Sequence, residues 1–174
     1  MRASKQLAVS GMLAALQIVL MFLGSVIWVL CYCAPMFCGL IMIILKESVG
    51  TKHCFIVYAV CSIIGLLFLP DKECVLTYIF FFGYYTIIRG GFEKLPKALA
   101  VVLKLLLYNV SIAASQLILF YVFGVPFESD FGKWSIPVLL LSFNIVFVFY
   151  EMLLPRLTFI YHKKYKSRVD RLLK

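Results

Sequence analysis

Apolar residues come in long blocks along this chain, and the short segments between the blocks hold most of its charges. The longest block runs from Gln6 to Leu45 and contains no Asp, Glu, Lys, Arg or His. About 20 apolar helical residues cross the hydrocarbon core of a bilayer, so this block is long enough for two crossings. The blocks predict six membrane-spanning helices, with approximate bounds Leu7–Val29, Ala34–Leu45, Cys54–Leu69, Cys74–Ile88, Ala98–Phe123 and Ile136–Ile160.

The composition also indicates a protein embedded in lipid. Hydrophobic residues make up 64% and charged residues 14% of the chain, whereas a soluble domain is about half apolar and a quarter charged. We therefore predict an all-α polytopic membrane protein, with a compact bundle of six transmembrane helices at residues 1–161 and a basic cytoplasmic tail at 162–174. Arg2 and Lys5 before an apolar run also fit a cleaved signal peptide, but the apolar stretch continues too far, which favours a retained helix.

The positive charges predict how the helices are oriented. If the N-terminus lies in the cytoplasm, all of the 17 Lys and Arg residues except Lys72 and Lys133 fall on the cytoplasmic side. This distribution follows the positive-inside rule and predicts that both termini are cytoplasmic. Because the charges are divided among short loops and the tail, we expect membrane lipids rather than nucleic acid as partners. For the tail, contact with the anionic inner leaflet and simple solvation both remain open.

The six cysteines lie mostly within apolar runs and lack the C-x-x-C spacing of zinc or redox sites. We interpret them as small buried residues. Cys31, Cys33 and Cys74 are expected near the outer face, where a disulfide remains open.

Lys104 and Glu151 are opposite charges that we expect at matched depth in the inner half of the last two helices. Charged side chains within a membrane usually face the protein interior and pair with one another. We therefore predict an ion pair between them. The alternative is that Lys104 extends to the membrane interface while Glu151 faces a cytoplasmic pocket.

Gln116 and Asn144 are expected in the outer half of the same two helices. Both amides can hydrogen-bond a ligand that enters from outside, or they can bond each other or a neighbouring helix. Tyr78 and Trp134 can line the same opening, although aromatic residues also gather at membrane interfaces without a ligand. These four residues form the predicted substrate-binding set.

The sequence contains no motif of a known enzyme class. H-E-x-x-H, G-x-S-x-G and glycine-rich phosphate loops are all missing, and the acidic residues form no metal-ligand pattern within a span. We therefore expect no catalytic site, metal or cofactor in this chain.

Small residues recur four positions apart in the first predicted helix, as in Ser4 and Ala8, Ser10 and Ala14, and Gly11 and Ala15. This spacing allows the backbone of another helix to approach closely within lipid. Docking of a partner helix is therefore predicted at Ser10, Gly11, Ala14 and Ala15.

The segment from Lys5 to Leu20, KQLAVSGMLAALQIVL, resembles the opening of the substrate-binding S components of energy-coupling factor (ECF) importers. In this family the first helix carries a pair of alanines four apart, whereas this chain has Ser10/Ala14 and Gly11/Ala15. The resemblance implies a bacterial cell membrane, a small vitamin-like ligand, and docking on a transmembrane coupling protein driven by two cytoplasmic ATPases. The alternative is a small structural or assembly membrane protein without a ligand.

Overall fold

The computed structural model describes residues 2–27, 30–92, 95–124 and 135–165, and these described residues are almost wholly helical with no strand. The predicted all-α class is therefore confirmed. A π-helical turn, η2, joins α4 and α5 into one continuous helical segment, and a second one, η4, ends the described chain. The elements are α1 (Arg2–Val26), α2 (Cys33–Ser48), α3 (Thr51–Phe68), α4 (Lys72–Thr77), η2 (Tyr78–Phe82), α5 (Gly83–Phe92), α6 (Lys97–Phe123), α7 (Ser135–Ile160) and η4 (Tyr161–Tyr165).

Five helical segments within the described residues are long and apolar enough to cross a membrane. The helix predicted at Ala34–Leu45 is not one of them, because α2 has only 16 residues. Protein rather than lipid surrounds this short helix, since α2 contacts α1, α3, α5, η2 and α7. The five segments are Ser4–Val26, Thr51–Phe68, Lys72–Phe92, Lys97–Phe123 and Phe143–Lys164.

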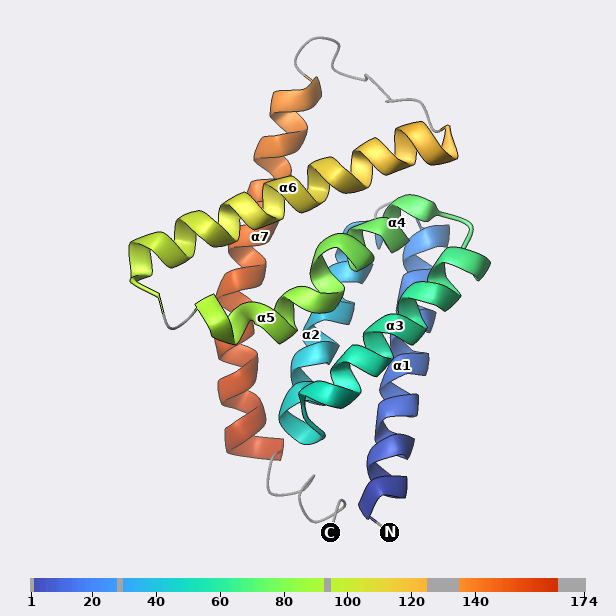
Figure 1. Ribbon diagram of the computed structural model, residues 1–174, viewed down its shortest axis with the longest axis vertical. Coiled ribbons are helices and arrows are strands. Elements are labelled where there is room, and N and C mark those ends of the chain that lie inside the picture. Colours follow the sequence, from blue (N-terminus) through green and yellow to red (C-terminus); the bar gives the residue numbers. More distant parts are fainter. Residues whose placement is uncertain (1, 28–29, 93–94, 125–134, 166–174) are drawn as a thin grey trace.

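The helices form two sets that cross each other (Figure 1). Helices α1, α2 and α7 follow the long axis of the molecule, while α3, the α4–η2–α5 segment and α6 are inclined across them. The start of α1 and the end of α7 reach the same end of the bundle, and α4 begins toward the opposite end (Figure 1). The side of the membrane that each end of the bundle faces remains a prediction from charge.

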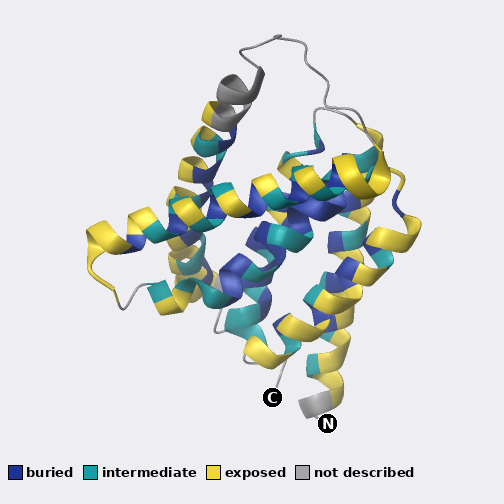
Figure 2. Ribbon diagram, turned by 45° about the horizontal axis from the view of Figure 1, so that its top comes forward, coloured by how far each residue is buried: buried dark blue, intermediate teal, exposed yellow. Residues whose placement is uncertain are grey.

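Buried residues lie mainly where the helices face one another in the interior of the bundle (Figure 2). They form two packed clusters, and α2 contributes to both. One cluster, here the sulfur core, lies among α1, α2, α3 and α4; the other, the aromatic core, lies among α2, η2, α5, α6 and α7. The sulfur core includes Met21, Cys38, Met42, Cys54, Cys61 and Cys74. The aromatic core includes Phe81, Phe82, Tyr85, Tyr108, Phe147 and Tyr150.

Cysteines of the sulfur core allow the helices to approach α1 closely. The thiols of Cys61, Cys38 and Cys74 donate weak hydrogen bonds to backbone carbonyls of α1, at sulfur–oxygen distances of 3.5 to 3.8 Å. Five of the six cysteines are buried and all six are free thiols, whereas Cys33 is exposed. The interpretation as small buried residues therefore holds for all of them except Cys33.

The outer surface of the bundle is strongly apolar, as a lipid-facing surface should be. Met12, Leu67, Phe68 and Tyr121 are each more than 70% exposed. Monomeric soluble proteins rarely expose contiguous apolar surface on this scale. The exposed side chains thus support the membrane assignment independently of helix length.

Gly39 provides a test of the packing around α2. A Cβ at this position would overlap the Tyr150 hydroxyl and lie 3.0 Å from the Phe82 carbonyl oxygen. We predict that Gly39→Ala lowers stability by about 1–3 kcal/mol, because α7 or η2 must shift to admit the methyl group. Thermal unfolding in detergent would measure the effect. Gly11→Ala is the matched control, since a Cβ there meets nothing; equal unfolding temperatures for the two variants would contradict this packing.

Candidate functional site

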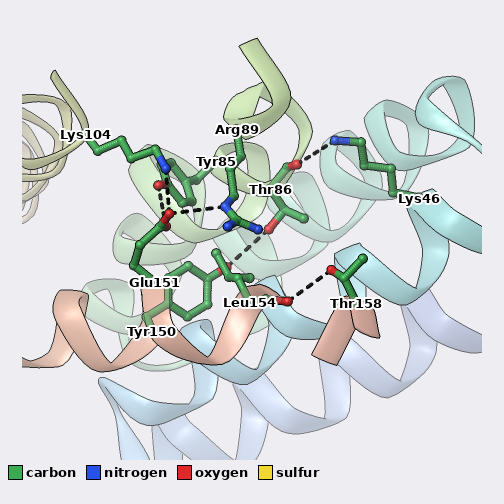
Figure 3. A network of polar contacts seen from close by, with 9 residues as sticks. All are labelled: Lys46, Tyr85, Thr86, Arg89, Lys104, Tyr150, Glu151, Leu154 and Thr158. Atoms are coloured by element: carbon green, nitrogen blue, oxygen red, sulfur yellow. Dashed lines mark hydrogen bonds and ion pairs between the residues drawn. The ribbon is translucent and has the colours of Figure 1, made fainter. Parts of the chain in front are cut away.

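A polar cluster centred on Glu151 of α7 joins α5, α6 and α7 (Figure 3). Lys104 Nζ of α6 lies 2.6 Å from Glu151 Oε1, and Arg89 Nε of α5 lies 3.3 Å from the same oxygen. The Tyr85 hydroxyl donates a hydrogen bond to Glu151 Oε2 at 2.7 Å. The ion pair expected between Lys104 and Glu151 is thus present, and two further groups complete the Glu151 cluster.

Local sequence explains this geometry. Tyr85 and Arg89 are four residues apart in α5, so they lie on one helix face and reach the same carboxylate. Pro155 lies inside α7 and has no N–H to donate to the Glu151 carbonyl, which leaves the helix without one of its hydrogen bonds at this point. Neither Tyr85 nor Arg89 was expected in the cluster, although their spacing of four residues near the end of α5 was a signal for it.

A second set of hydrogen bonds connects the cluster to α2. The Thr86 hydroxyl donates to the Gly39 carbonyl at 3.0 Å and lies 3.2 Å from the Tyr150 hydroxyl (Figure 3). Lys46 Nζ donates to the carbonyls of Thr86 and Ile87 at 3.0 and 3.2 Å. These two carbonyls lie within α5, so the Lys46 ammonium adds charge-assisted hydrogen bonds that connect α2 to α5.

Another polar cluster, centred on Glu73 of α4, lies where α4 begins. The Tyr32 hydroxyl and the Gln116 amide both donate to Glu73 Oε1, at 2.8 and 2.7 Å. Burial and the Glu73 charge raise the pKa of Tyr32, so its hydroxyl stays protonated and remains a donor. Asp71 caps α4 by accepting from the Glu73 backbone N–H at 2.9 Å, and its other oxygen accepts from the Cys31 thiol at 3.0 Å.

The structure places the predicted substrate-binding residues at separate positions. Gln116 bonds to Glu73, while Asn144 exchanges two hydrogen bonds with Asn109, at 3.0 and 3.1 Å. Tyr78 is fully buried and donates to the Gln17 side chain at 2.9 Å. Trp134 lies outside the described residues. These hydrogen bonds therefore connect the three described side chains to three different partners.

The predicted docking residues divide between two faces of α1. Ser10 and Ala14 are buried within the bundle, and the Ala14 carbonyl accepts from the Cys61 thiol of α3. Gly11 and Ala15 are exposed on another face. Consecutive helical residues point about 100° apart, so one stretch of small residues serves both the inside and the outside of the bundle.

The Glu151 cluster predicts unequal effects for its members. Glu151→Gln leaves two cations facing an uncharged amide, whereas Lys104→Met leaves the carboxylate with Arg89 and Tyr85. We expect Glu151→Gln to cost about 1–3 kcal/mol, more than Lys104→Met, because the amide no longer neutralises the partly buried cations that face it. Unfolding temperatures of both variants and of the double variant would measure this. Strictly additive losses would show that the two groups do not interact.

Comparisons with protein-family models, curated proteins and solved structures found no match to this chain. Its resemblance to ECF S components therefore stays a prediction from the sequence. The membrane assignment has separate support in the length and apolar surface of the helices.

Proposed function

We propose that this chain is a membrane-embedded substrate-capture subunit of a nutrient importer that docks through α1 on a transmembrane coupling protein. The observation that carries the proposal is a stripe of four small residues on the outward face of α1. Hydrolysis of ATP would belong to partner proteins, because the sequence contains no phosphate-binding loop motif. The stripe consists of Ser4, Ala8, Gly11 and Ala15, all exposed.

The stripe has a geometry that contact with lipid does not require. Its members are spaced four, three and four residues apart, so they form one row along the helix. A Cβ at Gly11 would meet no atom of the described residues within 4 Å, so the described helices leave this position of the row uncovered. Large side chains pack against lipid at least as well as small ones, whereas close approach of a second helix needs small ones. The row therefore favours a helical partner.

For ligand capture we propose the Glu73 cluster, at the end of the bundle away from the described termini. Gln116 is the predicted binding residue that belongs to it, together with Glu73 and Tyr32. These groups offer a carboxylate, an amide and a hydroxyl, which suit a ligand that carries N–H or O–H donors. Tyr78 and Asn144 instead connect helices within the bundle.

A structural or assembly protein without a ligand is the second candidate, and one observation favours it. Tyr78, Gln116 and Asn144 each already have a protein partner. Hydrogen bonds between helices are sufficient to explain polar residues in a membrane bundle. In that case the α1 stripe would join a different partner, and no small molecule would be retained.

Purification from native membranes with two readouts tests the proposal and separates the candidates. We predict that Gly11→Trp with Ala15→Trp abolishes co-purification of coupling proteins, because indole rings keep the partner backbone away. The same variant should still retain a small molecule detectable by mass spectrometry, since the stripe is distinct from the Glu73 cluster. Ala14→Trp is avoided because Ala14 packs inside the bundle.

Leu16→Trp is the matched control, because Leu16 is 47% exposed on α1 but lies off the stripe. It should leave co-purification intact. Normal assembly of the Gly11/Ala15 variant would reject docking at the stripe. Failure of the wild-type protein to retain any small molecule would reject substrate capture and favour the structural candidate.

A further inference from the structure

Two thiols that are distant in sequence come together beside the Glu73 cluster. Cys31 lies in the turn before α2, and Cys74 lies in the first turn of α4. Cys31 is 4% exposed and Cys74 is fully buried. Both belong to the sulfur core and lie toward the α4 end of the bundle, which the charge distribution predicts to face outward.

The cap of α4 is the first observation that places them side by side. Asp71 is the N-cap residue, and Cys74 follows it at the third helical position. Side chains at these two positions of a helix lie next to each other, as in a capping box. The Cys31 thiol is bonded to the Asp71 carboxylate at 3.0 Å, so it is held beside the Cys74 side chain.

The end of α1 provides an independent observation. A Cβ on Gly24 would lie 3.3 Å from Cys74 Sγ and 3.1 Å from the carbonyl oxygen of Leu30, the residue before Cys31. One small volume at Gly24 thus borders both the first turn of α4 and the turn that carries Cys31. Glycine at this position lets the two segments approach each other over the α1 backbone.

We propose that Cys31 and Cys74 form a disulfide when this end of the bundle meets an oxidising environment. The inference rests on the predicted outward orientation, and not on the proposed ligand or docking partner. In the reaction, the two thiols lose two protons and two electrons, and one S–S bond forms between them. A disulfide of the low-molecular-weight or oxidoreductase class accepts the electrons and protons; its own S–S bond breaks and two thiols are released.

The bond would have a structural consequence at the Glu73 cluster. It would tie the turn before α2 to the start of α4 and close the loop that contains α2 and α3. Closing a long loop restricts the unfolded chain and stabilises the folded one. Tyr32, which donates to Glu73, follows Cys31 directly, so its position relative to α4 would become fixed. Oxidation would therefore rigidify the proposed ligand site and remove the hydrogen bond from Cys31 to Asp71, while the bonds of Tyr32 and Gln116 to Glu73 stay in place.

The test uses the purified full chain in detergent, incubated for hours with oxidised or reduced glutathione, since buried thiols react slowly. Free thiols are then alkylated, and linked peptides are identified by mass spectrometry without reduction. We expect a peptide linking Cys31 to Cys74 after oxidation, and a rise of about 5 °C in unfolding temperature. Cys31→Ser and Cys74→Ser should each abolish both changes, while Cys54→Ser, in the same core but on α3, should keep them.

Several outcomes would overturn the proposal. Full alkylation of Cys31 and Cys74 after oxidation would do so, as would a link from Cys74 to the exposed Cys33 instead. Because peptide mapping of the wild-type protein needs no variant, the result stands even if a serine variant fails to fold. A negative result would leave the proposed function intact, since small-molecule retention and co-purification are measured separately.

Discussion

The arrangement of α5, α6 and α7 depends on the contacts that the Glu151 carboxylate makes. A charged group at membrane depth is costly unless it is paired and hydrogen-bonded. Here one carboxylate receives Lys104 from α6 and Arg89 and Tyr85 from α5. Since the side chains of all three charged groups are less than a quarter exposed, water compensates them only in part. The helices that supply these groups must therefore stay together.

The short helix α2 extends this constraint to the other half of the bundle. Its Gly39 carbonyl accepts from Thr86 and its Lys46 donates to carbonyls within α5, so α2 is bonded to the segment that carries Arg89. On its other side, α2 contributes Cys38 and Met42 to the sulfur core with α1 and α3. Polar contacts thus specify one face of α2, and close packing of small thiols specifies the other. The α1 face turned away from this core is where the proposed partner would dock.

Much of this fold could be predicted from the sequence, because hydrophobic blocks and charge reveal which segments are helical and how deep each residue lies. The matched depth and opposite charge of Lys104 and Glu151 were sufficient to predict their ion pair, which the structure contains. Rotation about the helix axis could not be predicted. For this reason the sequence did not reveal that Asn144 bonds to Asn109 and Gln116 to Glu73. It also did not reveal that Ser10 is buried while Gly11 is exposed. The shortness of α2 was visible, but its burial depended on the neighbours that surround it.

Hydrogen–deuterium exchange in lipid nanodiscs, comparing the wild-type protein with Glu151→Gln, tests this account most directly. Exchange reports the local opening of each helix, so it distinguishes the two halves of the bundle. If Glu151 holds the last helices together, amides of Gly83–Phe92 and Ser135–Ile160 will lose protection, while those of α1 and α3 keep theirs. Unchanged protection in α5 and α7, or an equal loss in every helix, would contradict the account.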